Sequence, residues 1–316
     1  MASGKTAVVA LGGNAITVPG MEDTIANQFA NTRRSLDGIV ELVRDGYNLV
    51  VTHGNGPQVG NALLRNEMAR GSAPDLPLGV LVADTQGGMG YMIEQSLQNR
   101  LKKEGIERRV VTIVTQMIVD EEDPAINNPT KYIGQFYTEK QARTYEQNLG
   151  WQMKQDANRG WRRVVPSPKP KSSVEGSTIR QLVEQGNIII AGGGGGIPVY
   201  IDTFGNLEGL DAVIDKDWAS AVIAREVNAQ VLCILTSVDQ VSLDFGKENQ
   251  QELGTVTLAE LKRYRDEGHF PAGSMGPKVD AAIAFMENGG DVVTITSFNL
   301  AGAALRGEAG TRIVSE

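Results

Sequence analysis

The sequence predicts an α/β protein with an open, mainly parallel central sheet and a small subdomain inserted into its first half. Short apolar strands alternate with helices that are apolar on one face along most of the 316 residues. Several strands run directly into glycines, which is typical of doubly wound sheets that bind ligands beyond the carboxyl ends of their strands. Between about residues 119 and 171, prolines and aromatic residues replace this alternation, and the change indicates the inserted subdomain.

Residues 188–200, with the sequence IIIAGGGGGIPVY, contain the clearest signal in the chain. Three isoleucines predict a strand buried on both faces of the sheet, and five consecutive glycines follow Ala191. Because glycine loses the most backbone entropy on folding, this run indicates close approach of the backbone to a ligand. Amide groups that converge in such a turn bind phosphate or carboxylate oxygens, so we expect an anion site here. A flexible linker is the alternative, but linkers are rich in serine, and strand character resumes at Ile197.

The other elements follow from apolar periodicity and from glycine or proline at their ends. Two further glycine turns, at residues 12–14 and 54–56, each follow a strand, and the second opens a helix whose N-terminus favours an anion. This second turn matches a dinucleotide fingerprint only weakly, because no acidic residue ends the next strand. Strands are expected at residues 7–11, 48–52, 110–115, 188–190, 197–201, 231–235, 292–295 and 311–314. Helices are expected at residues 24–44, 57–70, 83–103, 174–185, 218–227, 257–267 and 278–287. In the inserted subdomain, residues 151–154 and 162–165 are expected to form a hairpin.

The composition restricts the classes of partner. A net charge of −8 and a pI near 5.0 argue against nucleic acid or an anionic membrane surface as a partner. Residues 1–6 contain no apolar leader, and no run approaches about eighteen apolar residues, so a cytoplasmic location is expected. The single cysteine, Cys233, is expected in the core. His53 and His269 are too isolated to form a zinc site, and no metal held by protein ligands is expected.

Three lysines stand out by their surroundings. Lys216 lies between Asp215 and Asp217 at a helix start, Lys278 begins a helix after a glycine-rich loop, and Lys131 lies in the inserted subdomain. Most lysines are simply solvent-exposed. Phosphoryl transfer, however, requires cations placed around the transferring group. We assign Asp217 to orient lysines, with capping of the following helix as its alternative role, and we assign no role to Asp215.

Eight blocks of the sequence occur in this order: AVVALGGNAI, VVTHGNGPQVG, NPTKYIGQFYTEKQA, VVPSPKP, IIIAGGGGGIPV, LDAVIDKD, LTSVDQV and GSMGPKVDAAIAF. Together they resemble the carbamate kinases, a branch of the amino acid kinase superfamily. The resemblance extends from residue 7 to about residue 314. The five glycines, AVIDKD and GSMGPKV are specific to that branch rather than shared across the superfamily.

This resemblance implies reversible phosphoryl transfer between carbamoyl phosphate and ADP, giving carbamate and ATP. It implies an open αβα sandwich, the amino acid kinase fold, in a homodimer. The chain would form one domain with two lobes, residues 1–190 for carbamate and 191–316 for nucleotide, and residues 119–171 would be a protruding lid. Magnesium would be bound through the nucleotide phosphates.

The resemblance also implies roles for particular residues. The catalytic residues would be Lys131, Lys216, Asp217 and Lys278. Carbamate or carbamoyl phosphate would bind at Gly12, Gly13, Asn14, Gly54, Asn55 and Gly56. The adenine nucleotide would bind at Thr236, Ser237, Val238, Met275 and Gly276, and the glycine run would contribute Gly193, Gly194 and Gly195.

Three positions depart from the family pattern. Tyr132 and Gln135 stand where the family usually has proline, so the loop that presents Lys131 is expected to be looser. Ser237 stands where an acidic or small residue is expected, and the sequence does not explain it.

Other functions stay open at this point. A kinase acting on the carboxylate of glutamate or aspartate would share the lysines, but no clamp for an amino acid backbone is evident. A regulator that binds nucleotide without catalysis would not need the four catalytic residues. A dehydrogenase that uses a dinucleotide is a more distant alternative.

Overall fold

The computed structural model describes residues 4–12, 16–17, 21–156, 159–271 and 273–316. Its central sheet has eight strands in the order β15-β17-β16-β12-β1-β2-β9-β3. All neighbouring pairs are parallel except β16 and β17. The strands are β1 (Thr6–Leu11), β2 (Asn48–His53), β3 (Val110–Thr112), β9 (Ile188–Ile190), β12 (Val231–Thr236), β15 (Thr255–Thr257), β16 (Val292–Ser297) and β17 (Thr311–Val314).

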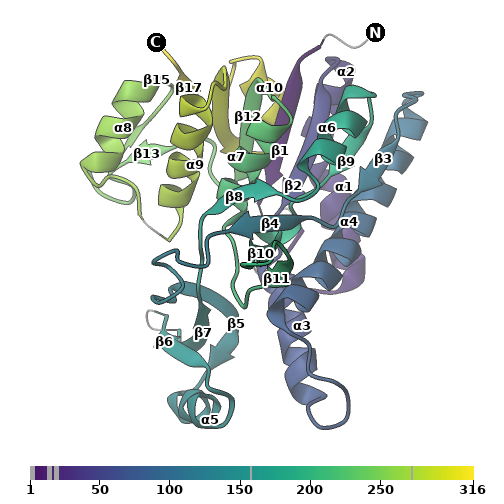
Figure 1. Ribbon diagram of the computed structural model, residues 1–316. Helices are drawn as coiled ribbons and strands as arrows, with labels where there is room; N and C mark the ends of the chain where they lie inside the picture. The colour runs from purple at the N-terminus through teal and green to yellow at the C-terminus, as the bar shows by residue number, and fades with distance from the viewer. Residues whose placement is uncertain (1–3, 13–15, 18–20, 157–158, 272) are drawn as a thin grey trace.

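Helices cover both faces of this sheet, so the molecule has the three layers of an αβα sandwich (Figure 1). One face packs against α2 (Asp37–Arg44), α4 (Leu78–Lys103) and α10 (Ala301–Leu305), with α1 (Ile25–Ser35) beside them. The other face packs against α6 (Gly176–Glu184), α7 (Lys216–Glu226), α8 (Leu258–Asp266) and α9 (Met275–Glu287). Alternate residues of one strand enter opposite clusters: Val8 packs on the α7 side, whereas Ala7 and Val9 pack on the α2 side.

A second, four-stranded sheet connects the body to the inserted subdomain. It has the order β11-β10-β4-β8 and consists of β4 (Gln116–Val119), β8 (Pro170–Ser173), β10 (Ile197–Ile201) and β11 (Leu207–Gly209). A separate hairpin pairs β13 (Ser242–Leu243) with β14 (Gln251–Glu252). No helix among the residues that the structure describes is both long and apolar enough to cross a membrane.

The inserted subdomain, called the lid below (residues 119–171), protrudes from the body (Figure 1). It contains β5 (Lys131–Tyr137), α5 (Glu139–Leu149), β6 (Gln152–Gln155) and β7 (Trp161–Val165). The predicted hairpin is confirmed as β6 and β7, whereas β5 and α5 were not predicted. The lid also shares a core with the body: Ile133 and Val165 are buried with Val59 and Leu63 of α3 (Gly56–Met68). The base of the lid therefore packs on α3.

Several predicted boundaries were wrong, and local chemistry explains the clearest case. The expected helix at residues 24–44 is two helices, α1 and α2, which meet at Leu36. Near the end of α1, the hydroxyls of Thr32 and Ser35 donate to the backbone carbonyls of Gln28 and Thr32. Such side-chain bonds to the preceding turn bend or end helices. The helix expected from residue 83 begins five residues earlier, at Leu78, directly after Pro77.

Candidate active site

Three parallel strands at the centre of the sheet end at the same edge. Gly12 follows β1, residues 54–56 follow β2, and Thr236 ends β12, which pairs with β1. The amide of Gly54 donates to the carbonyl of Leu11 at 3.1 Å, so the first two turns are in direct contact. Gly13 and Asn14, predicted as substrate-binding, lie outside the described residues. The described turns therefore meet at one edge, as expected for a parallel sheet.

The start of α7 lies at this edge and is held by its own side chains. Asp215 is the N-cap, and its Oδ1 accepts from the backbone amide of Asp217 at 2.9 Å. The hydroxyl of Ser220 donates to the carbonyl of Lys216 at 2.6 Å and also lies 2.6 Å from the hydroxyl of Thr52 at the end of β2. The capping alternative for Asp217 is therefore wrong, because Asp215 is the cap.

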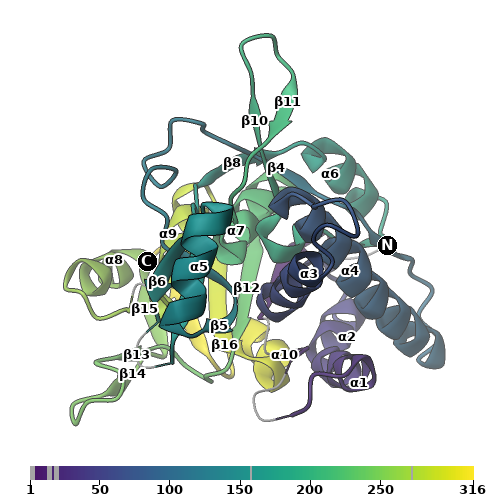
Figure 2. The same cartoon turned by 90° about the horizontal axis from the view of Figure 1, so that it is seen from below.

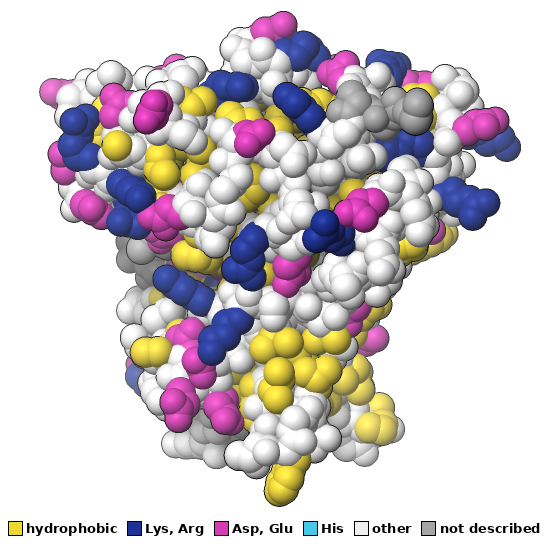
Figure 3. All heavy atoms as spheres, turned by 45° about the horizontal axis from the view of Figure 1, so that its top comes forward, with side chains coloured by type: hydrophobic (Ala, Val, Ile, Leu, Met, Phe, Trp, Pro, Cys, Tyr) yellow, Lys and Arg dark blue, Asp and Glu magenta, His cyan; other side chains and the backbone are white. Residues whose placement is uncertain are grey.

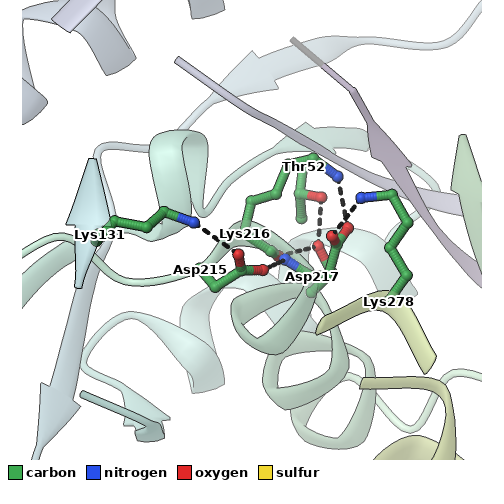
Figure 4. Close-up of polar contacts among 7 residues, drawn as sticks. Thr52, Lys131, Asp215, Lys216, Asp217 and Lys278 are labelled. Carbon is green, nitrogen blue, oxygen red and sulfur yellow. Dashed lines mark hydrogen bonds and ion pairs between the residues drawn. The ribbon is translucent and has the colours of Figure 1, made fainter. Parts of the chain in front are cut away.

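Asp217 joins two lysines from different helices. Its Oδ1 lies 2.5 Å from Nζ of Lys216, and its Oδ2 lies 2.9 Å from Nζ of Lys278 on the first turn of α9. The Asp217 side chain is only 3% exposed, against 13% for Lys216 and 17% for Lys278. One buried carboxylate thus fixes two ammonium groups, which is the arrangement expected of a residue that orients lysines (Figure 4).

The charges of this group depend on one another. Burial by itself would raise the pKa of Asp217, but the ammonium groups of Lys216 and Lys278 lower it to about 2. Burial lowers the pKa of Lys216, and Lys278 lowers it further, while Asp217 opposes both. The carboxylate therefore stays ionised at neutral pH. It can hold cations but cannot supply a proton.

The third lysine reaches the same place from the lid. Nζ of Lys131, on β5, lies 2.8 Å from Oδ2 of Asp215. Figure 4 shows Lys131 and Lys278 approaching the start of α7 from opposite sides. The structure thus brings together three lysines that are far apart in the sequence. Sequence reasoning missed Asp215, whose place beside Lys216 gave no sign that it would pair with the lid.

The five glycines pack against the protein itself. Gly193–Gly195 form a short 3₁₀ turn whose neighbour Gly192 has a φ of 61°. A side-chain carbon at Gly193 would lie within 3.0 Å of His53, and one at Gly194 would lie within 3.0 Å of Asn55. All five glycines are buried. The other three meet Ile223, Ile214 and Met117, so close packing within the protein is a sufficient reason for all five glycines, and it differs from the ligand contact that the sequence suggested. Their contact with nucleotide stays a prediction.

Comparisons with known proteins show which family the sequence and the fold of this chain match. The family model described as "Amino acid kinase family" matches residues 5–297. The carbamate kinase of Pyrococcus horikoshii is 51% identical over 97% of this chain and 98% of its own. A carbamate kinase-like protein of Escherichia coli is 47% identical over 97% of this chain and 98% of its own. The structure of carbamate kinase from Giardia lamblia bound to AMP-PNP has a TM-score of 0.93 at 42% identity, covering 99% of both chains.

The chain belongs to the amino acid kinase family. Within that family it is a carbamate kinase and therefore a phosphotransferase, because the carbamate kinases match it at about half identity over nearly its whole length. The predicted fold and enzyme class are confirmed, and the dehydrogenase alternative is set aside.

Five of the residues predicted to bind nucleotide lie at the end of β12 and at the start of α9. Thr236 and Val238 are partly exposed at the end of β12, and Ser237 is exposed. Met275 and Gly276 begin α9, where the amide of Gly276 donates to the carbonyl of Pro271 at 2.9 Å. Both β12 and α9 pack against α7. These residues can therefore border the lysines, and nothing in the structure explains the exposed Ser237.

The carboxylates of this site do not form a cage for Mg²⁺. No group of three or more His, Cys, Asp or Glu side chains among the described residues could hold a metal ion. Asp215 and Asp217 are both engaged by lysine ammonium groups. Mg²⁺ prefers oxygen ligands and is often bound through substrate phosphates. A magnesium ion would accordingly have to arrive with a nucleotide.

His53 is a buried residue of the site that the sequence did not single out. It ends β2, lies against Gly193 and is 1% exposed. Burial lowers its pKa to about 4, a hydrogen bond to the carbonyl of Gly54 opposes this, and Lys216 lowers the pKa further. His53 is thus neutral at physiological pH.

Proposed function

We propose that this carbamate kinase transfers a phosphoryl group reversibly between carbamoyl phosphate and ADP at the start of α7, where Asp215, Lys216 and Asp217 lie. The observation that supports the proposal most is the approach of Lys131, Lys216 and Lys278 to two neighbouring carboxylates at the edge of the sheet. Three ammonium groups provide the positive charge that a transferring phosphoryl group requires, and most of the catalysis of such a transfer is positioning and electrostatics.

In the proposed reaction, an oxygen of the β-phosphate of ADP forms a bond to phosphorus while the bond from phosphorus to the carbamate oxygen breaks. The electron pair of the broken bond leaves with carbamate, and nothing is oxidised or reduced. Lys216 and Lys278 offset the charge on the phosphoryl oxygens as it develops. Asp217 holds both lysines in place, and Lys131 adds a third cation from the lid. Magnesium, when bound to the nucleotide phosphates, supplies further positive charge.

Substrates are proposed to occupy opposite sides of the lysines, in two lobes comprising residues 1–190 and 191–316. Carbamate or carbamoyl phosphate would lie against the turns after β1 and β2, at Gly12, Gly13, Asn14, Gly54, Asn55 and Gly56. The nucleotide would lie against Gly193, Gly194, Gly195, Thr236, Ser237, Val238, Met275 and Gly276. Asn55 is 4% exposed, and its Nδ2 donates to the hydroxyl of Thr85 at 2.9 Å. This bond gives the second turn a fixed shape.

A coupled assay that measures ATP formation from ADP and carbamoyl phosphate tests the proposal. We expect turnover by the wild-type chain and almost none by the Lys278→Ala variant. The reverse assay, with ATP and either glutamate or aspartate, tests a kinase for amino acid carboxylates. Turnover with those acids but not with carbamoyl phosphate would refute the proposed substrate. Nucleotide binding without turnover in any arm would indicate a regulator.

A homodimer is proposed as the quaternary structure, and a cytoplasmic location stays a prediction. Hairpin β10–β11 projects from the body (Figure 2) and exposes Ile201, Phe204 and Leu207 by 50%, 88% and 43%. The face drawn in Figure 3 carries both basic and acidic side chains, and a hydrophobic patch lies in its lower part. Exposed apolar patches often mark protein interfaces. Analytical ultracentrifugation should show a dimer for the wild type and weakened association for Phe204→Glu. A wild-type monomer would contradict this.

A further inference from the structure

We propose that Asp215 is a positioning residue that holds Lys131 of the lid at the reaction centre. The inference rests on the proposed function and adds to it a residue to which neither the sequence pattern nor the comparisons give a role. Its basis is that the two oxygens of one carboxylate serve two different parts of the chain. Oδ1 accepts from the amide of Asp217, and Oδ2 lies 2.8 Å from Nζ of Lys131.

The first of these contacts makes Asp215 a fixed point. As the N-cap of α7, it satisfies a backbone amide that would otherwise have no partner in the helix. The Asp215 side chain is 18% exposed, so it is more constrained than a surface carboxylate. Its second oxygen is therefore held at the start of α7, next to Lys216 and Asp217, where the transferred group is proposed to lie.

The lid meets the same part of the body at three other points. The amide of Val213 donates to the carbonyl of Pro166 at 3.0 Å. Nη2 of Arg163 lies 2.9 Å from Oδ2 of Asp211. Nζ of Lys169 lies 4.5 Å from the centre of the Trp218 ring. The chain that leaves the lid, residues 163–169, thus contacts residues 211–218, which lead into α7.

These contacts also set the place of Lys131. In the ladder between β5 and β7, Lys131 pairs with Val165, the residue before Pro166. Lys131 therefore lies on the strand that pairs with β7, and the segment that leaves β7 contacts the residues that lead into α7. Only the long lysine side chain is left to be ordered, and ordering a free lysine costs rotamer entropy. Asp215 offsets that cost with an ion pair.

Charge balance gives Asp215 a second effect. Asp217 already balances the charges of Lys216 and Lys278, one at each of its oxygens. Lys131 carries the same charge as both of those lysines and is 37% exposed. Without Asp215, repulsion would favour its turning toward solvent. A reacting group displaced in this way loses much of its catalytic benefit.

The Asp215→Asn variant separates this role from capping, because Asn is as good an N-cap as Asp but carries no charge. We expect kcat for ATP formation to fall about tenfold to a hundredfold, with the KM for ADP little changed. We also expect Asp215→Asn to have no further effect in a Lys131→Ala background, because the two residues act together. Asp215→Glu, which restores the charge, should recover part of the kcat.

A readout that does not need activity is the labelling of lysine amines in the folded full-length protein by an acetylating reagent, followed by peptide mass spectrometry that locates each acetyl group. Acetylation of Lys131 should rise in Asp215→Asn. The matched control is Asp120→Asn, which removes the carboxylate 2.6 Å from Lys171 at the base of the lid. There, acetylation of Lys171 should rise, while Lys131 labelling and kcat should stay at wild-type values.

The proposal is overturned if kcat of Asp215→Asn equals that of the wild type, or if its loss multiplies with that of Lys131→Ala. Unchanged Lys131 labelling in Asp215→Asn also overturns it. Should Asp215→Asn fold poorly, Asp215→Ser offers a second uncharged cap for the same measurements. If the wild type makes no ATP, the proposed function fails, and the labelling result still decides whether Asp215 holds Lys131.

Discussion

The three lysines of the site form a group with two ends, Lys216 and Lys278 at one and Lys131 at the other, and the two ends are held in different ways. At the α7–α9 corner, defined here as Lys216, Asp217 and Lys278, the shared carboxylate is 3% exposed and both lysines are mostly buried. At the lid end, Lys131 is 37% exposed and has one carboxylate partner, Asp215. Removing one member of a buried ion pair is strongly destabilising, whereas exposed pairs contribute about 0–1 kcal/mol. The corner is therefore expected to keep its contacts as long as the protein is folded, whereas the Lys131 side chain can change its contacts.

This difference fits a site that substrates must enter and leave. A fixed pair of cations can be complementary to the transition state only if it does not move during the reaction. A group that covers the substrate has to change its contacts at each turnover. Substitutions in the corner are thus expected to lower both kcat and the free energy of unfolding. Substitution of Lys131 is expected to lower kcat but to change the free energy of unfolding very little.

The largest expected effect is the loss of a corner lysine. Lys278→Ala, and likewise Lys216→Ala, should lower kcat by about 100-fold to 1,000-fold, with little change in the KM for nucleotide, because the interaction strengthens in the transition state. Steady-state kinetics at varied ADP measure this. Lys262→Ala, which removes a surface lysine 2.6 Å from Glu287 at the end of α9, is the control. An unchanged kcat with a raised KM would show that the corner only binds substrate.

Next in size is the structural cost of removing the shared carboxylate. Asp217→Asn leaves two largely buried ammonium groups without their partner, so the free energy of unfolding should fall by about 2–4 kcal/mol. Urea denaturation at neutral pH measures the change. A loss below about 1 kcal/mol would place the corner in the same class as an exposed ion pair.

Burial of His53, at the end of β2, should also make stability depend on pH. Its pKa is 6.5 in the unfolded chain and about 4 in the folded one, so the unfolded state binds the proton first as pH falls. The stability contribution is complete above the unfolded value and is lost as pH falls toward the folded one. Between about pH 7.5 and about pH 5, the free energy of unfolding should decrease by about 2 kcal/mol through this residue.

Urea denaturation of His53→Gln at both pH values isolates this contribution, because the variant lacks the titrating group. Its pH dependence should be smaller than that of the wild type by the amount given above. Equal dependence in the wild type and His53→Gln would show that His53 is not held neutral by burial.

The smallest expected effect is on stability at the lid. Lys131→Ala should change the free energy of unfolding by less than about 1 kcal/mol, because it removes one partly exposed ion pair. The same variant should still lose kcat. A stability loss above about 2 kcal/mol would mean that Lys131 is a structural link between lid and body, and the comparison of the two ends would fail.

Much of the fold could be predicted because its signals are local. A strand such as β9 is three isoleucines, and a turn such as residues 54–56 is marked by its glycines, so neither depends on distant residues for its recognition. The polar, weakly patterned helix α5 was missed because its only buried residue is Ala142, which gives no apolar face to detect.

The candidate site was predictable only where neighbouring residues suggested charge chemistry. Lys216 lies beside two aspartates, and that context drew attention to it. The orienting role of Asp217 was predicted, but the partners of the two aspartates were not predictable. Asp215 meets Lys131, 84 residues away, and Asp217 meets Lys278, 61 residues away.

The sequence by itself thus determined an alternating α/β chain, three glycine turns and the lysines that carry the proposed chemistry. The tertiary structure alone decided that Asp215 caps α7 and pairs with Lys131 of the lid, which two lysines share Asp217, and that Gly193 and Gly194 pack against His53 and Asn55. The reason is physical. Helix and strand patterns depend on residues a few positions apart, whereas ion pairs and close backbone packing depend on how distant segments meet in space.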